Sequence, residues 1–176
     1  MISSPTIDPD RRYLSIVAGV PAVVAERLVA WRAGQGLVGP AAESCHITVL
    51  ISEDAGGNPL NALRRAVAGL GPVQVGLGPV ASFEPVTPVT YLPVVVGSDR
   101  LNLIHTACQK AVGESVSPFP YEPHLTLANH APVPALEASL RDFAALPAEL
   151  ARFTLTDLTV YRFREGSWQE LGKVRL

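Results

Sequence analysis

The fold of this chain is decided by two similar segments of sequence, CHITVL at residues 45–50 and PHLTLA at residues 123–128. Each has a histidine followed two residues later by a threonine. In an extended strand alternate side chains share a face, so His46 lies beside Thr48, and His124 beside Thr126. The apolar residues between them then point into a core. If the two strands are neighbours, two imidazoles and two hydroxyls converge on one spot, where they can hold a phosphate and move protons.

Size and composition favour a folded domain that acts on a small substrate. The chain has 176 residues, of which 48% are hydrophobic and 17% charged, so it can bury a sizeable core and is not disordered. The net charge of −2 supplies no basic field for a long polyanion. We therefore expect a small or short substrate and no extended nucleic-acid binding, and we expect the protein to be a monomer.

Cysteine content and hydropathy predict a cytoplasmic location. Cys45 and Cys108 are the two cysteines, too few for a disulfide framework or a metal site of cysteine pairs. No apolar run approaches the ~18 residues of a membrane span, so no membrane association is expected.

The first residues leave an alternative open. Residues 1–11 are expected to form a flexible leader before a single domain at 12–176. Arg11 and Arg12 precede a short apolar stretch, a pattern that can act as an export signal. Asp8 and Asp10 offset the charge of these arginines, which favours a strand over a signal.

Periodicity and turn signals predict an order of elements that is roughly repeated. The expected elements are a strand at 13–20, a helix at 21–33, a strand at 44–51, a helix at 58–70, one or two strands within 72–96, a helix at 98–112, the second histidine strand, a helix at 134–146, and a hairpin of 153–163 and 168–176. A Ser98-Asp99 cap is expected to open the helix at 98–112, and Glu165-Gly166 to form the hairpin turn. Proline is expected to stay out of a central strand. One histidine motif thus falls in each half.

The paired motif resembles that of the two-histidine phosphoesterase superfamily, in its 2'-5' RNA ligase-like branch. The second copy is the better match, because FPYEPHLTLA at residues 119–128 is similar to that branch's aromatic, proline and His-apolar-Thr-apolar signature. The order of elements over residues 12–176 is also similar to the family plan.

The resemblance implies a fold class and an activity. The fold would be α+β and bilobal, with two pseudo-symmetric halves, each an antiparallel sheet with flanking helices, and a cleft between them. The activity would be metal-independent and cofactor-free chemistry on 2',3'-cyclic or related phosphodiesters, with a small nucleotide or an RNA end as the substrate. His46 and His124 would be catalytic, and Thr48 and Thr126 would bind the phosphate.

One departure from the family pattern concerns a cation. Many relatives have an arginine shortly after the second motif, where this chain has Asn129 and His130. An arginine of the terminal hairpin can compensate if it reaches the phosphate, and Arg162 is our candidate, although a solvated sheet face explains it equally well. Phe119 and Tyr121 are candidates for stacking a base, with packing as the alternative.

Other readings of the histidines stay open. Each motif alone could hold a half-buried structural histidine, and His105 in the helix at 98–112 is expected to pack or face solvent. Cys45 should point away from His46, so a Cys-His nucleophilic pair is disfavoured. A metal site of His130 with Glu122 is disfavoured because nearby prolines predict a loop.

The functional prediction is a phosphoric diester hydrolase that opens a cyclic nucleotide phosphate to a 2'-phosphomonoester by His/His acid-base catalysis. The sequence does not say which histidine is the base and which the acid. A 2'-5' RNA ligase or 2'-5' phosphodiesterase is the enzymatic alternative, because the same groups can run the reverse direction. A non-catalytic nucleotide- or RNA-binding domain is the alternative from another class.

Overall fold

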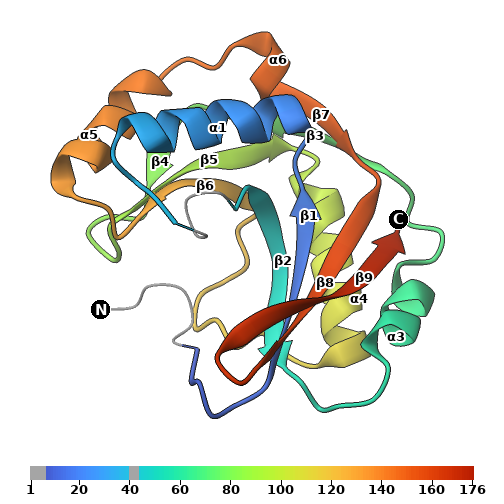
Figure 1. Ribbon diagram of the computed structural model, residues 1–176. Helices are drawn as coiled ribbons and strands as arrows, with labels where there is room; N and C mark the ends of the chain where they lie inside the picture. The colour runs from blue at the N-terminus through green and yellow to red at the C-terminus, as the bar shows by residue number, and fades with distance from the viewer. Residues whose placement is uncertain (1–6, 40–43) are drawn as a thin grey trace.

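The computed structural model describes residues 7–39 and 44–176, and Figure 1 shows them as a strongly curled antiparallel sheet with helices packed around it. The elements are β1 (Tyr13–Gly19), α1 (Ala22–Gly34), β2 (His46–Glu53), α3 (Pro59–Val67), β3 (Val73–Leu77), β4 (Ala81–Ser82), β5 (Val89–Val96), α4 (Ser98–Val112), β6 (His124–Asn129), α5 (Val133–Asp142), α6 (Ala148–Ala151), β7 (Arg152–Leu155), β8 (Asp157–Arg164) and β9 (Ser167–Arg175). The α+β fold class is therefore confirmed.

The strands form one hydrogen-bonded path in the order β7-β3-β5-β6-β2-β1-β8-β9, with β4 paired to β5 at the side. The two strands at the centre of this path, β2 and β6, are the ones that carry the histidine motifs. They pair antiparallel through Ile47 and Leu125. The motifs, which lie far apart in sequence, are thus brought into direct contact by the topology.

The two halves are related by a pseudo-two-fold arrangement, as the order of elements predicted. Strand, helix, histidine strand and helix occur as β1-α1-β2-α3 in the first half and as β5-α4-β6-α5 in the second. In the sheet, β1 lies outside β2 and β5 lies outside β6, and two further strands extend each side. The axis of this symmetry passes through the junction of β2 and β6, so both motifs lie next to it.

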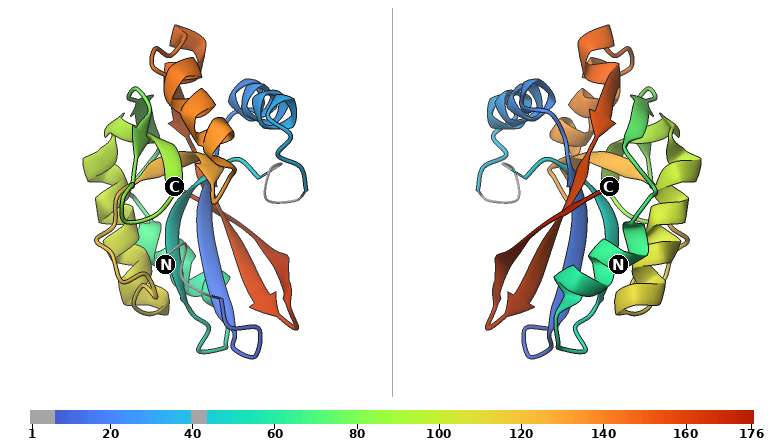
Figure 2. Two further views of the ribbon diagram at one scale, coloured as in Figure 1. Left: turned by 90° about the vertical axis from the view of Figure 1, so that its left-hand side faces the viewer. Right: turned by 90° about the vertical axis from the view of Figure 1, so that its right-hand side faces the viewer.

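Helices cover both sides of the sheet. Figure 2 shows α1 on one side and α3 with α4 on the other. The end of α1 is joined to the end of α5, because Trp31 Nε1 donates to Asp142 Oδ2 at 3.0 Å and the Trp31 ring meets Phe143 edge-on at 5.1 Å. These contacts hold α1 across the second half of the sheet.

The apolar residues of both motif strands are buried, as the alternation predicted. Ile47 and Val49 are 0% exposed, and Leu125 and Leu127 are 1% exposed. Val24 and Leu28 of α1 pack in the same core. Burying these side chains fixes which face of each strand carries the histidine and the threonine.

The stretch 72–96 contains three strands rather than one or two, and it places a proline in a central strand. Pro93 lies in β5, opposite His124 of β6. Its carbonyl accepts from Gly78 N at 2.8 Å, so its nitrogen faces the same neighbour, just beyond Leu77 where β3 ends. Proline has no N–H to return that bond, so it is tolerated in β5 because it lies where the ladder to β3 ends, and the expectation about proline was wrong.

The helix α4 has the predicted bounds, but its predicted cap is wrong. Gly97 is the N-cap residue, with φ 83°, and no side chain caps the helix. A Cβ on Gly97 would lie 2.2 Å from the carbonyl oxygen of Gln74. Glycine is required there because the chain turns in a left-handed conformation against β3.

The terminal hairpin turns at Glu165 and Gly166, which have φ 51° and 75°, as predicted. The strand expected at 153–163 is instead divided: β7 pairs with β3 in the second half, and β8 pairs with β1 in the first. The chain crosses between the halves at Thr156. The helix expected at 134–146 ends at Asp142.

The expected leader lies partly outside the described residues, which begin at residue 7. The described part forms a turn in which Arg11 N donates to the Asp8 carbonyl at 3.1 Å, and Arg11 forms an ion pair with Glu53. In the described part of the chain, no helix has the length and apolarity that crossing a membrane requires.

Candidate active site

The two histidine motifs lie side by side at the junction of the halves. Because Ile47 pairs with Leu125 in antiparallel register, the same register places His46 across from Thr126 and Thr48 across from His124. All four side chains are half-buried and share the face opposite to the buried apolar residues. The structure therefore brings together the four residues that the motif predicted.

The spacing suits a single small anion. In an antiparallel pair, residues on a diagonal have backbones roughly 7–8 Å apart, and His46 and His124 are on such a diagonal. The two rings are close enough that the charge of His124 contributes to lowering the pKa of His46. Two imidazoles and two hydroxyls at this spacing can contact one phosphate group from several sides.

The surroundings of His46 favour its neutral form. Burial is the main cause of its lowered pKa, followed by the positive charges of Arg32 and His124. Its Nδ1 lies 2.8 Å from the hydroxyl oxygen of Ser44, and an Nδ1–H donated to that oxygen leaves Nε2 free to accept a proton. A neutral, oriented imidazole is what a general base requires.

The surroundings of His124 differ. Its Nδ1 donates to the carbonyl oxygen of Glu122 at 2.6 Å, since a carbonyl can only accept, and this leaves Nε2 for other partners. Burial lowers the pKa of His124, while the carbonyl and the charge of Glu122 act in the opposite direction. Of the two histidines, His124 therefore has the environment that tolerates protonation better.

Two aromatic rings that sequence reasoning missed pack against His124. Phe83 and Tyr91 stack at 3.9 Å, and each meets the His124 ring at a steep angle, at 5.2 and 5.1 Å. The Tyr91 hydroxyl donates to Glu122 Oε1 at 3.3 Å. These contacts restrain the imidazole. Phe83 lies in the irregular stretch after β4, where no pattern indicated a role.

A buried arginine was also missed. Arg32 of α1 is 5% exposed, and its guanidinium donates to the carbonyl oxygens of Ser44, Thr126 and Leu127 at 2.7, 2.7 and 3.0 Å. A signal was present in the sequence, because Arg32 follows the apolar Leu28 by four residues and so continues the buried stripe of the helix.

The two aromatic candidates from the sequence are placed differently from each other. The Tyr121 ring stacks on His105 at 4.1 Å, and its hydroxyl donates to the carbonyl of Thr48 at 3.1 Å. These contacts correspond to the packing alternative, and the hydrogen bond holds Tyr121 against the motif residue Thr48 of β2. Phe119 is 42% exposed and lies on the segment leading to β6.

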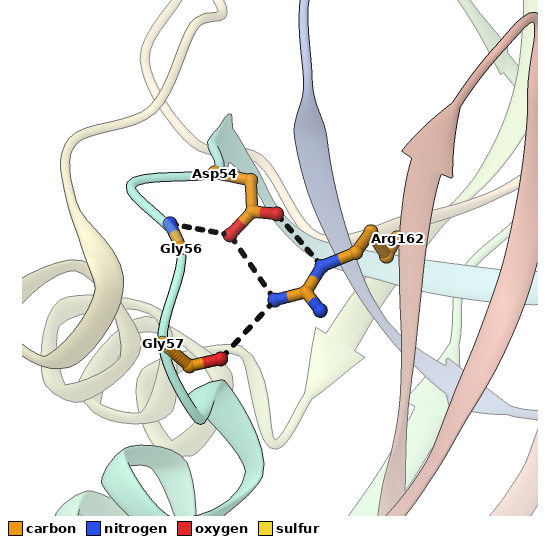
Figure 3. A network of polar contacts seen from close by, with 4 residues as sticks. All are labelled: Asp54, Gly56, Gly57 and Arg162. Carbon is orange, nitrogen blue, oxygen red and sulfur yellow. Dashed lines mark hydrogen bonds and ion pairs between the residues drawn. The ribbon is translucent and has the colours of Figure 1, made fainter.

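Arg162 is not brought to the motifs. In the sheet, Arg162 of β8 pairs with Leu14 of β1, which in turn pairs with Ser52 of β2. Ser52 is six positions from His46 along β2, or about 20 Å at the rise of a strand. Figure 3 shows its guanidinium on Asp54, with Nε 2.7 Å from Oδ2 and a terminal nitrogen 3.3 Å from Oδ1. The same nitrogen lies 3.4 Å from the carbonyl of Gly57. Arg162 thus anchors the loop after β2.

The remaining candidates have structural contacts. Cys45 Sγ faces α1, 3.5 Å from Arg32 and 3.8 Å from the Ala25 carbonyl, so it points away from the site, as expected. His105 is buried, and its Nδ1 donates to the Val49 carbonyl at 2.7 Å. His130 follows the end of β6 with φ 48°. Among the described residues, no group of three or more potential ligands could hold a metal ion.

Comparisons with known proteins agree with this geometry. A family model described as the 2'-5' RNA ligase superfamily matches residues 20–167. No curated protein matches the chain at a significant level. A solved structure described as a phosphoesterase has a TM-score of 0.61 and 18% identity, covering 96% of this chain and 99% of its own.

Two structures of E. coli LigT have the same fold. The complex with 3'-AMP has a TM-score of 0.62 and 19% identity and covers 96% of this chain and 99% of that one. The complex with phosphate has a TM-score of 0.61 and 18% identity and covers 95% and 98%. At these identities the likeness establishes the fold.

Proposed function

Since this chain belongs to the 2'-5' RNA ligase superfamily of two-histidine phosphoesterases, we propose that it is a cyclic phosphodiesterase that opens 2',3'-cyclic nucleotide or RNA-end phosphates to 2'-phosphomonoesters. Phosphodiester processing is the class of activity that membership supports. The observation that carries the finer proposal is the pairing of β2 with β6, which puts both histidines and both threonines on one face.

In the proposed reaction, a general base takes a proton from water as the water oxygen attacks phosphorus. The bond from phosphorus to the 3' oxygen breaks, and a general acid gives a proton to that oxygen. We assign His46 as the base, because burial and the charge of Arg32 favour its neutral form. We assign His124 as the acid, because Glu122 offsets the effect of burial on its pKa and the anionic substrate adds to this.

Thr48 and Thr126 have the proposed role of donating hydrogen bonds to the non-bridging phosphate oxygens. Preorganised donors are most effective where charge builds in the transition state. Support for a nucleotide phosphate as ligand comes from E. coli LigT, whose solved structures include complexes with phosphate and with 3'-AMP.

We propose hydrolysis rather than ligation as the main direction. Ligation needs a second polynucleotide end held beside the first, and the net charge of −2 gives no general attraction for a polyanion. Water is always available at the same site. Joining of RNA ends is nevertheless an outcome that the experiment below can detect.

The test is an assay of 2',3'-cyclic AMP and of an RNA carrying a 2',3'-cyclic end, with chelator present throughout. Products are separated to distinguish the 2'-monophosphate, the 3'-monophosphate and joined RNA. The wild-type chain is compared with His46→Ala and His124→Ala, and His130→Ala is the matched control because His130 is exposed and lies beyond the end of β6.

We expect 2'-monophosphate from the wild type and from His130→Ala. The two motif variants should lose on the order of 10²–10⁴-fold in rate while keeping the circular dichroism of the wild type. Nucleotide binding without turnover by the wild type would instead favour the non-catalytic binding domain, and a joined product would favour the ligase.

A further inference from the structure

A β-bulge interrupts β2 directly after the first motif. In the pairing with β1, Leu50 lies opposite Ile16 and Thr48 lies opposite Val17, so Val49 is an extra residue. Val49 and Leu50 are accordingly buried in succession, at 0% and 2% exposure, where strict alternation would put one of them on the face of the site. A bulge bends its strand and re-aims the adjacent side chains, and bulges are frequent beside active sites. The direction of the Thr48 side chain therefore depends on what holds this bulge.

The second motif ends in the same way. In the pairing of β6 with β5, Ala128 lies opposite Thr90 and Thr126 lies opposite Tyr91, which makes Leu127 the extra residue. Leu127 and Ala128 are both buried, at 1% and 3% exposure. A bulge after the threonine is thus repeated at equivalent positions of the two halves, on the two strands that carry the site.

Two side chains bind the successive carbonyl groups at the first bulge. The Tyr121 hydroxyl donates to the Thr48 carbonyl at 3.1 Å, and His105 Nδ1 donates to the Val49 carbonyl at 2.7 Å. The two rings stack on each other at 4.1 Å, with 6° between their planes. Burial raises the pKa of Tyr121, so its hydroxyl keeps the proton that it donates. The stacked pair therefore holds two donors at a fixed spacing against the bulge.

The second bulge is held by a comparable arrangement. There the Arg32 guanidinium donates to the carbonyls of Thr126 and Leu127 at 2.7 and 3.0 Å. In each half, a donor comes from the helix that precedes the other motif strand, because Arg32 of α1 binds β6 and His105 of α4 binds β2. The binding of both carbonyls thus occurs twice, each time at the residue pair that begins with a motif threonine, and this links it to the site.

Tyr121 also connects the first bulge to the second motif along the chain. The next residue is Glu122, whose carbonyl accepts from His124 Nδ1 at 2.6 Å. The hydrogen bond from Tyr121 to Thr48 therefore restrains, relative to β2, the segment whose carbonyl orients His124. One side chain thus contacts the backbone of the first motif and precedes the carbonyl that fixes the histidine of the second.

We propose that His105 and Tyr121 are positioning residues of this site, which bind the carbonyls of Thr48 and Val49 and so hold the bulge that aims the Thr48 hydroxyl at the phosphate. They act through the backbone of β2 and need no contact with substrate. The inference deepens the proposed function and rests on it for the kinetic part of its test, whereas the structural part of the test is independent of any activity.

The experiment removes each donor with little change of volume. Tyr121→Phe keeps the stacked ring and loses the hydroxyl. His105→Leu loses the donor to Val49, whereas His105→Asn, with a side chain of similar size to that of leucine, places an amide N–H one bond from Cγ, as Nδ1 is in histidine. The matched controls are Tyr161→Phe on β8, which β1 separates from β2, and His130→Leu, since His130 is exposed and lies beyond the end of β6.

The readouts are kcat and KM for 2',3'-cyclic AMP, and the hydrogen exchange of backbone amides followed by NMR. We expect Tyr121→Phe and His105→Leu each to lower kcat by roughly 10-fold, below the ~10²-fold cost of a 1 Å misplacement, because each variant keeps one of the two donors. The change in KM should be smaller, since a donor aimed at developing charge acts mainly in the transition state. Amide exchange should rise at residues 47–51 relative to β8.

The comparison of the two His105 variants separates positioning from packing. His105→Asn should recover most of the kcat that His105→Leu loses, because its amide can again bind the Val49 carbonyl. A ring that only filled space would give the opposite order, since a buried leucine costs less than a buried amide without a partner. The two controls should keep the kcat and the amide exchange of the wild type.

The proposal is overturned if Tyr121→Phe keeps the wild-type kcat, if its amide exchange at residues 47–51 is unchanged, or if His105→Asn turns over no faster than His105→Leu. Should His105→Leu fail to fold, Tyr121→Phe decides, because it keeps the ring and changes a single hydroxyl. A wild-type chain with no turnover of the cyclic nucleotide would sink the proposed function alone, because amide exchange would still report whether the two rings hold the bulge.

Discussion

Ile47 of β2 and Leu125 of β6 form the register pair through which the two halves of the sheet join. Each is the residue between a motif histidine and its threonine. Their side chains are 0% and 1% exposed, so the junction is part of the core while the polar neighbours on both sides stay on the opposite face. The geometry of the site is therefore set by the packing beneath it.

Removing apolar volume at this junction should cost stability. Leu125→Ala leaves a cavity beneath the site and is expected to lower the free energy of unfolding by about 2–5 kcal/mol. The measurement is urea denaturation, and Leu103→Ala is the control because Leu103 is 54% exposed on α4. An equal loss in both variants would show that the junction is not a packed part of the core.

The stability of the wild type should fall as the pH is lowered. Burial lowers the pKa of both His46 and His124, so in the unfolded chain, with values near 6.5, they bind protons at a pH where the folded chain does not. The free energy of unfolding therefore decreases below about pH 6.5, down to the folded pKa values. We expect a lower urea midpoint at pH 5.5 than at pH 7.5.

The double variant His46→Asn/His124→Asn should have a smaller difference between those two midpoints. His130→Asn is the control, since it removes an exposed imidazole. The same pH dependence in the double variant and in the wild type would mean that other groups are responsible.

The threonine hydroxyls can be removed with little change of shape. Thr48→Val and Thr126→Val should each lower kcat by about 10²-fold, the effect of losing one preorganised donor to a developing charge, with little change in the circular dichroism spectrum. Thr154→Val serves as control, because Thr154 is exposed on β7 and its hydroxyl contacts Gln74. Wild-type kcat in both motif variants would exclude the hydroxyls from the proposed chemistry.

Arg162 should matter for stability and not for turnover. Its partner Asp54 has a side chain that is 0% exposed, so Arg162→Met leaves a buried carboxylate unpaired, at a cost of about 3–5 kcal/mol. Since the pair lies far along β2 from the motif, kcat of the folded variant should match the wild type. Arg164→Met, an exposed change on the same strand, gives the baseline; a large loss of kcat confined to Arg162→Met would place Arg162 near the substrate after all.

The sequence correctly predicted those helices and strands whose apolar pattern and end signals lie within or directly beside the element itself. The helix α4 has the predicted bounds because its apolar period and the flanking glycines are local. The stretch 72–96 and the division of the last strands at Thr156 were not predicted, because β3, β5 and β7 are defined by their partners. Pairing across the chain, rather than propensity, decides such strands.

The candidate site divides in the same way. The two motifs identified the imidazoles and hydroxyls, since alternation along a strand fixes which side chains share a face. Phe83, Tyr91 and Arg32 were missed because each reaches the site from an element that is remote in sequence; Arg32 and Leu127, for example, are 95 residues apart. Arg162 was chosen for its charge, and the register of the sheet places it elsewhere.

By itself, the order of residues determined the repeated plan of the halves and the two histidine-threonine pairs, because hydrophobic alternation and helical period act within a single element; the α+β class was implied by the family resemblance. Only the tertiary structure decided that β2 meets β6, that Arg32 donates both to Ser44 before β2 and to residues of β6, and that His46 and His124 have different electrostatic surroundings. These features depend on distances between segments that are far apart in the sequence, and burial strengthens the electrostatic effects between them.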